Sequence, residues 1–187
     1  FQILPWILSA GGTVDAIDGL PWTETFEFFS ELLKSGSMSA NCINLTQTDV
    51  AREFNEGKTA MMQNGPWVLP MLKEAGTDYG IVSLSENGSP AAVLGGENIT
   101  IIKGKNAEGS LVFLNYCMEN EELLKFCKSA SILPAKISAA KEMAAEDEDM
   151  KVFEEQMNYA VSRTSVPQWE TIAQKLTDRM YSLVQEN

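Results

Sequence analysis

The residue of this chain best suited to bind a ligand is Trp67, which follows the turn Asn64-Gly65-Pro66. Proline is favoured at the first position of a helix, so the turn predicts that Trp67 lies in a first helical turn. Backbone N–H groups there have no partner within the helix. A flat apolar ring beside free donors suits a ligand that has both polar groups and apolar faces, as a sugar has. The alternative is that Trp67 anchors a hydrophobic core.

A helix, an extended segment and a second helix are expected to position Trp67. Thr46 and Asp49 have the spacing of a capping box, and Gly57 is suited to end the helix that they begin. The dense apolar residues of Lys58 to Gln63 indicate a buried inner strand. The second helix is expected from Pro66 to Ala75.

Three other aromatic residues are candidates for ligand contact. Phe1 and Trp6 precede a Gly-Gly turn, and Trp169 follows Pro167. An aromatic face can lie against the C–H groups of a sugar ring, while amides and carboxylates take its hydroxyls. Each buried hydroxyl must find a partner, because an unmatched one costs about 1–3 kcal/mol. For Trp6 and Trp169 a place in the core is the stronger expectation.

A second polar candidate is the segment Gly95-Gly96-Glu97, which precedes a β-branched run from Asn98 to Ile102. The run predicts an inner strand. Gly96 allows the backbone to approach a ligand closely. Glu97 can accept hydrogen bonds from hydroxyls, and the alternative is an exposed carboxylate at a strand edge. The N–H of Gly65 is the matching donor expected near Trp67.

Composition and charge exclude several classes of function. The 187 residues carry a net charge of −12, so a phosphate-binding surface and a nucleic-acid partner are not expected. The chain has no histidine, which removes the commonest general base and transition-metal ligand. Its three cysteines form no C-x-x-C pair, and Glu146-Asp-Glu-Asp149 lacks the spaced ligands of a calcium loop. We expect a solvated helix start there and neither metal nor cofactor.

The rest of the chain divides into a mixed part and a helical part. Trp22, Phe26, Phe29 and Leu33 share one face of a helix that Gly36 closes. A strand is expected from Tyr79 to Leu84. Beyond Lys103 the pattern is almost wholly helical, with Asn106 and Asn120 as caps. The last helix carries a buried stripe, formed by Ile172, Leu176, Met180 and Leu183.

An ordered series of motifs resembles the sugar-binding group of extracellular solute-binding proteins of bacterial ABC importers, the group that includes maltose-binding protein. The series begins with F-N-x-G-K-x-A-M-x-x-N-G-P-W, which ends at Trp67. It continues with Tyr79-Gly80-Ile81, Leu94-Gly-Gly-Glu-Asn98 and the run from Lys103 into a helix. Leu133-Pro-Ala135 and Val166-Pro-Gln-Trp169 complete it. The resemblance covers nearly the whole chain in the same order.

The resemblance implies an incomplete α/β fold of the type II periplasmic-binding-protein class. Residues 1–102 would form the main part of the C-terminal lobe, 103–165 would belong to the other lobe, and 166–187 would return as a closing helix. Roughly the first half of the parent protein would then be missing. The resemblance also makes Trp67 the stacking platform. Many relatives carry an aromatic residue where Glu97 stands, so a stacking role is not carried over to that position.

The resemblance implies a protein that captures a carbohydrate and delivers it to membrane permease subunits. It would lie outside the bacterial membrane, lipid-anchored, or in the periplasm. Two other classes remain open from the residues: a carbohydrate-active enzyme with paired carboxylates, and a structural or interaction domain without a ligand. Because one lobe alone would carry one wall of the site, we expect weak sugar binding by this chain. We also expect residues 103–165 to pack abnormally, to fold back or to pair with another copy.

Overall fold

The computed structural model describes residues 2–16, 19–86, 89–163 and 166–186 of the chain. These residues form two compact units. Unit 1 comprises residues 1–63, 82–94 and 156–187, and unit 2 comprises residues 64–81 and 95–155. Helices dominate both units, and the few strands are two or three residues long.

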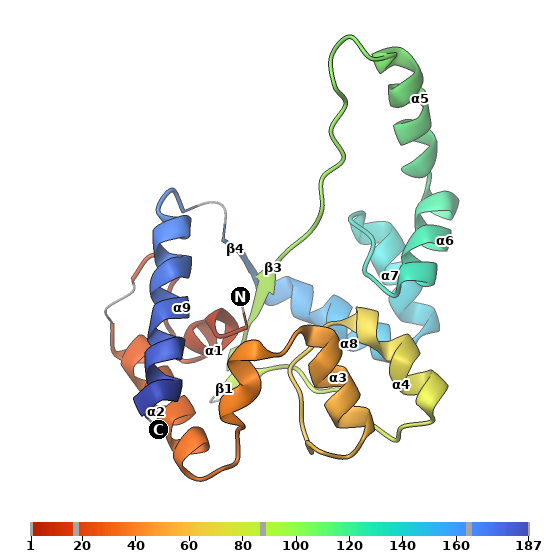
Figure 1. Cartoon of the computed structure of the whole chain (residues 1–187). Coiled ribbons are helices and arrows are strands. Elements are labelled where there is room, and N and C mark those ends of the chain that lie inside the picture. Colours follow the sequence, from red (N-terminus) through yellow and green to blue (C-terminus); the bar gives the residue numbers. More distant parts are fainter. Residues whose placement is uncertain (1, 17–18, 87–88, 164–165, 187) are drawn as a thin grey trace. The chain divides into compact units, whose positions relative to one another are not determined.

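The core of unit 1 lies among three helices: α1 (Leu4–Ser9), α2 (Leu20–Lys34) and α9 (Trp169–Glu186). Helix α9 runs alongside α2, and α1 also packs against α2 (Figure 1). The helices are held by one cluster of buried apolar side chains, formed by Ile7, Trp22, Phe26, Phe29, Ile172, Leu176 and Leu183. The stripes predicted on α2 and α9 are therefore confirmed, with Leu33 and Met180 at the edge of the cluster. Gly36 has a φ of +72°, which suits glycine after a helix end.

Unit 1 also contains η1 (Ala40–Asn44) and α3 (Gln47–Asn55). The capping box at the start of α3 is confirmed, because the Thr46 side chain accepts from the Asp49 N–H and the Asp49 carboxylate accepts from the Thr46 N–H. Gly57, with a φ of +69°, follows the helix end as predicted.

The strands of unit 1 form two small sheets. Strands β1 (Ser85–Glu86) and β2 (Ser89–Pro90) pair in antiparallel fashion. Strand β3 (Ala92–Leu94) pairs in parallel with β4 (Ala160–Ser162), so that Val93 lies opposite Val161. The turn η3 (Met157–Tyr159) leads into β4. This parallel pair joins segments that lie more than sixty residues apart in the sequence.

Three predicted strands are wrong. Residues 58–63, 79–84 and 98–102 form no strand in the structure. The side chains of Met61 and Ile99, which were expected to be buried, are largely exposed. A strand is stabilised by the hydrogen bonds and side chains of a neighbouring strand. Among the described residues no strand pairs along these three segments, although the Ala91 N–H donates to the Leu84 carbonyl at 3.1 Å, so their apolar and β-branched residues alone do not make a sheet.

Unit 2 is helical. It begins with η2 (Pro66–Val68) and α4 (Leu69–Ala75), and continues with α5 (Ala107–Cys117), α6 (Asn120–Ala130), α7 (Ile137–Glu146) and α8 (Glu148–Gln156). The prediction that the chain beyond Lys103 is mainly helical is confirmed. Buried side chains come from α4, α6, α7 and α8, with Leu72, Met143 and Met150 among the least exposed. Helix α5 has no buried residue.

The predicted caps of unit 2 are confirmed in part. The Asn106 side chain accepts from the Gly109 N–H at the start of α5. At the next helix, Glu119 is the N-cap and Asn120 is the first helical residue, so the predicted cap is displaced by one position. The Asn120 side chain instead donates to Glu142 on α7. The buried position of Cys127 in α6 fits the expected role of a small apolar side chain, and burial raises the pKa of its thiol.

Replacing Leu183 by alanine should destabilise unit 1, because Leu183 is fully buried in the cluster between α2 and α9. We expect the free energy of unfolding in urea to fall by about 2–5 kcal/mol. Tyr181→Ala on the same helix is the matched control, since Tyr181 is half-exposed. Equal losses in the two variants would contradict this assignment of the core.

Candidate functional site

Trp67 lies in η2 between two buried residues. The side chains of Pro66 and Val68 are buried, whereas that of Trp67 is 45% exposed. The buried side chains of Val68, Leu69 and Leu72 fix this segment in unit 2. Trp67 is therefore held by its neighbours while part of its ring remains open to solvent. This exposure is too large for a core anchor, which was the alternative to a ligand platform.

The ring of Trp67 folds back over Gly65. A Cβ atom placed on Gly65 would lie only 2.1 Å from Cη2 and 2.3 Å from Cζ3 of the indole. The φ of Gly65 is −111°, which other residues can adopt, so glycine is required at this position for space and not for backbone freedom. The ring thus lies against the backbone of Gly65, which fixes its orientation. We call this contact the seat of Trp67. The sequence motif contained both residues, but this contact became visible only with the turn built.

The backbone donors beside the ring are fewer than expected. The N–H of Gly65 donates to the Asn64 side-chain oxygen at 3.0 Å, so it is not free for a ligand in this structure. The turn η2 has three residues and α4 has seven, so the helix dipole is small here. What the segment offers a ligand is therefore mainly the apolar face of the indole.

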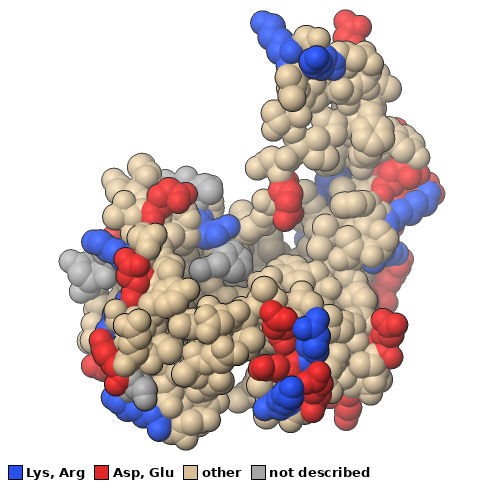
Figure 2. Space-filling model, viewed as in Figure 1, with Lys and Arg blue, Asp and Glu red and all other residues tan. Residues whose placement is uncertain are grey.

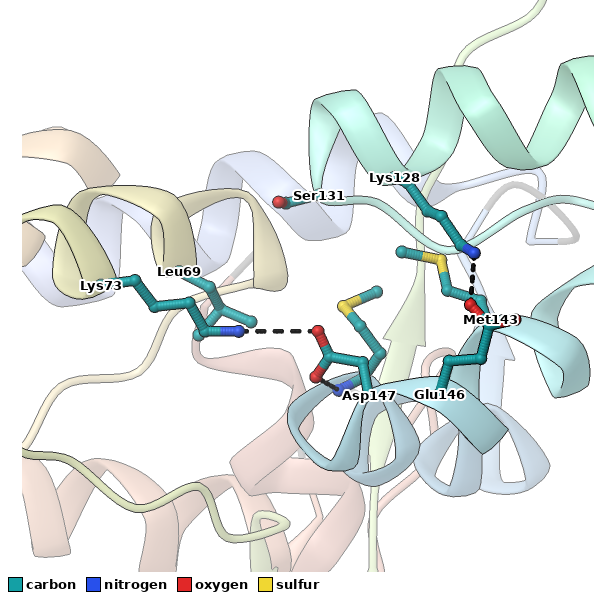
Figure 3. Close-up of a pocket in the computed structure, with 8 residues that line it drawn as sticks. Leu69, Lys73, Lys128, Ser131, Met143, Glu146 and Asp147 are labelled. Atoms are coloured by element: carbon teal, nitrogen blue, oxygen red, sulfur yellow. Dashed lines mark hydrogen bonds and ion pairs between the residues drawn. The ribbon is translucent and has the colours of Figure 1, made fainter.

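A charged network fixes helix α4, which follows Trp67, to the start of α8. Lys73 on α4 lies 3.0 Å from a carboxylate oxygen of Asp149 and 3.5 Å from one of Asp147. The hydroxyl of Tyr79 donates to the same Asp149 oxygen at 2.7 Å. Asp149 thus holds both the helix and the segment that follows it. Figure 3 shows Lys73 reaching from α4 towards Asp147.

The network shifts the pKa values of its members. Burial by itself would raise the pKa of Asp149, but the hydrogen bonds from Tyr79 and Lys73 outweigh it and hold that pKa below its usual value. The hydrogen bond to Asp149 raises the pKa of Lys73. Burial, followed by the hydrogen bond to Asp149, raises the pKa of Tyr79 to about 12. Each pKa shift favours the protonation state found in the network, with Asp149 ionised and with Lys73 and Tyr79 protonated.

Unit 2 also has an open depression of about 300 Å³ beside this network. Lys128 pairs with Glu146 on its rim, and Asp147 accepts from the backbone N–H groups of Asp149 and Met150 (Figure 3). Its floor is apolar, with Leu69, Met143 and Met150. The charged groups on the rim are paired with one another, so this region is a joint between helices. The expected helix start at residues 146–149 is confirmed, whereas its pairing with Lys73 was missed.

Two of the other candidates lie in unit 1. The ring of Trp6 packs 5.5 Å from that of Phe28 and 5.6 Å from that of Phe29, and its indole N–H donates to Gln63 at 2.9 Å. The guanidinium of Arg163 lies 5.5 Å from the ring of Trp169. Trp6 and Trp169 are both partly buried against the core cluster. Phe1 lies outside the residues that the structure describes.

Gly96 and Glu97 belong to unit 2, as do Gly65 and Trp67. Both lie in an exposed segment without helix or strand, and no atom lies within 4 Å of where a Cβ of Gly96 would stand. Neither residue lines the depression near Asp147, and neither does Trp67. A concave face shared by Trp67, Gly96 and Glu97 stays a prediction.

Among residues 2–16, 19–86, 89–163 and 166–186, no three His, Cys, Asp or Glu side chains are arranged to hold a metal ion. No helix in the same part of the chain is long and apolar enough to cross a membrane.

Comparison with known proteins places these features in a wider context. Residues 1–152 match the model of the family described as bacterial extracellular solute-binding protein. Two curated relatives, both named maltooligosaccharide ABC transporter solute-binding lipoprotein, come from Streptococcus pneumoniae strains TIGR4 and R6. Each is 32% identical over 100 residues, which cover 51% of this chain and 23% of the relative. The chain thus matches less than a quarter of the length of these relatives.

Replacing Gly65 by alanine should displace the Trp67 ring, because the new methyl group would occupy the place of the benzene ring of the indole. We expect acrylamide to quench Trp67 fluorescence more strongly in Gly65→Ala than in the native chain. Gly80→Ala is the control, since nothing lies within 4 Å of a Cβ there. The increase should vanish when Trp67 is also replaced by phenylalanine. An unchanged quenching constant in Gly65→Ala would contradict the contact between the Trp67 ring and Gly65.

The raised pKa of Tyr79 should make stability depend on alkaline pH. A folded-state pKa of about 12 lies above the unfolded value near 10, so this contribution is complete below about pH 10 and is lost as pH rises through about 12. Tyr79→Phe removes this titration and the hydrogen bond. We expect the difference in unfolding free energy between the native chain and Tyr79→Phe to shrink from about pH 9 to about pH 11. A difference that is constant over this range would rule out the contribution.

Proposed function

We propose that this chain, which belongs to the family of bacterial extracellular solute-binding proteins, is part of the ligand-capturing component of an ABC importer for a carbohydrate. The observation that carries the proposal is the half-exposed Trp67 ring seated on Gly65. The names of the two pneumococcal relatives support a maltooligosaccharide as the class of ligand.

The seated ring fits a sugar for a physical reason. A pyranose presents patches of C–H groups on its faces and hydroxyls around its edge. The flat indole can cover such a patch, and its seat on Gly65 removes freedom that binding would otherwise have to restrict. An aromatic platform held in advance loses less conformational entropy than a loose one. The remaining requirement is a set of polar groups around the ring.

Polar partners for the hydroxyls are proposed at Gly96 and Glu97, in the exposed segment of unit 2. A carboxylate accepts hydrogen bonds from hydroxyls, and the backbone at Gly96 has open space around it. Trp6 and Trp169 remain weaker candidates, because both pack against the core cluster of unit 1. Phe1 and the Gly65 backbone complete the proposed set. No catalytic residue, cofactor or metal is part of it.

We further propose that the chain adopts an incomplete type II periplasmic-binding-protein fold. Residues 1–102 would form the main part of one lobe, residues 103–165 would belong to the other, and residues 166–187 would return to the first. The motif order supports this assignment. Family sites lie between two lobes, so this chain would carry one wall of the site. Its partners would be permease subunits, and its place the outer face of the membrane, lipid-anchored, or the periplasm.

An enzyme is the less favoured reading. A glycosidase needs two carboxyl groups that face the sugar and that differ from each other in pKa. The closely placed Asp147 and Asp149 both lie within 4 Å of the Lys73 ammonium, and the pKa of Asp149 is lowered, the opposite of what a general acid needs. These two carboxylates act in the joint between α4 and α8.

Replacing Trp67 by alanine should weaken sugar capture in the longer protein that the proposal implies. We expect the dissociation constant for a maltooligosaccharide to rise at least about tenfold, equivalent to about 1.4 kcal/mol. Trp22→Phe is the control, since Trp22 is buried in the core cluster of unit 1 and is not part of the proposed set, and it should change the constant by less than about threefold. Isothermal titration calorimetry gives both values. An unchanged affinity in Trp67→Ala would refute the platform.

The 187-residue chain alone should bind the same maltooligosaccharide weakly, with a dissociation constant above about 1 mM. The reason is that one wall cannot satisfy all the hydroxyls of the ligand. Calorimetry at high protein concentration measures this. Micromolar binding by the chain alone would contradict the proposal that half of the site is elsewhere.

A further inference from the structure

Helix α5 is exposed, although its composition is that of a buried helix. Between Ala107 and Cys117 its only charged side chain is Glu108, and apolar residues lie on every side of it. A helix that is hydrophobic all round is normally buried on all sides. Yet none of the residues of α5, all of which the structure describes, is buried. Figure 2 shows this helix, at the upper right, as a largely uncharged surface with charges near its tip.

Exposed apolar side chains lie on α5 and on the adjoining α6. Val112, Phe113 and Tyr116 are 70%, 63% and 50% exposed, and their spacing places them on one face of α5. The Tyr116 hydroxyl is hydrogen-bonded to Glu122 of α6, which satisfies the polar end of that side chain. Phe126, also exposed, stands one turn beyond Glu122 on α6. The α5 face, as we call it, consists of Val112, Phe113, Tyr116 and Phe126.

The α5 face is large enough for a specific interface. An aromatic side chain buries about 150–250 Å² when fully covered, so four half-exposed apolar side chains offer on the order of 450 Å². Two such faces would bury about 900 Å² of apolar surface. Apolar atoms make up about 65% of a homodimer interface, so the whole interface would be about 1,400 Å². Stable interfaces start at about 1,200 Å².

Charge at the two ends of α5 favours a second copy in antiparallel orientation. Lys103 and Lys105 are exposed before its first turn, and Glu119 is exposed just after its end. No ion pair of Lys105 or Glu119 occurs within the described part of the chain. A two-fold axis at residue 112, the middle of α5, brings Lys105 of one copy opposite Glu119 of the other. It also places the Val112 side chains of the two copies against each other.

We propose that this 187-residue chain forms a two-fold homodimer through the antiparallel α5 face. The contact is isologous, because the same patch is used on both copies. The apolar centre supplies the driving force, and the paired Lys105 and Glu119 fix the direction. This surface has no part in the sugar site proposed around Trp67, so the two proposals stand or fall separately.

Light scattering after size-exclusion chromatography tests the dimer. We expect a mass that rises with concentration towards twice 20.6 kDa for the native chain. Phe113→Glu should raise the dimer dissociation constant at least about tenfold. Met61→Glu is the control, because Met61 is 87% exposed in unit 1 and outside the face. Far-UV circular dichroism shows that the variants keep their helices.

Reversal of the end charges tests the antiparallel direction. Lys105→Glu and Glu119→Lys should each weaken the dimer, and the double variant should restore the native dissociation constant to within about threefold. A monomer of 20.6 kDa at every concentration would overturn the proposal and leave the α5 face to another part of a longer protein. Equal weakening by Met61→Glu, or no recovery in the double variant, would overturn it as well.

Discussion

Apolar side chains that leave water need other atoms to cover them, and the two units meet this need differently. In unit 1, α2 and α9 each contribute a stripe and α1 contributes Ile7, and these side chains form a single cluster around Phe26 and Leu183. In unit 2, α4, α6, α7 and α8 contribute buried residues, whereas α5 keeps its apolar surface outside. The cover that α5 lacks within its own unit is the strongest sign of a further contact on this chain.

The same constraint explains the position of the ligand platform. Val68, Leu69 and Leu72 are buried, and they fix the segment that carries Trp67. The ring itself lies over a residue with no side chain, so it gains contact with backbone atoms and keeps an open side. Asp149 then holds α4 and the residues after it through Lys73 and Tyr79. Buried apolar side chains thus fix the segment that carries Trp67, and the contacts of Asp149 hold the far end of α4.

Local signals predicted the parts of the fold that depend on neighbours in sequence. The α2 stripe, the capping box at Thr46 and the helix end at Gly57 require only residues within one or two turns. The inner strands failed because a strand needs a partner, which the residues of the strand do not specify. The joint between Tyr79 and Asp149 spans 70 residues, and no spacing rule reaches so far. Trp67 was identified from its motif, but its seat on Gly65 depends on the conformation of the turn.

NMR tests most directly whether the Trp67 ring, seated on Gly65, binds a sugar. The chain has four tryptophans, which give four indole N–H signals that single Trp→Phe variants assign. Titration with a maltooligosaccharide up to tens of millimolar allows even weak binding to be detected. We predict that the Trp67 signal shifts in a saturable way, while the signal of the buried Trp22 stays in place. A Trp67 signal that does not move, or a shift confined to the other tryptophans, would contradict the claim.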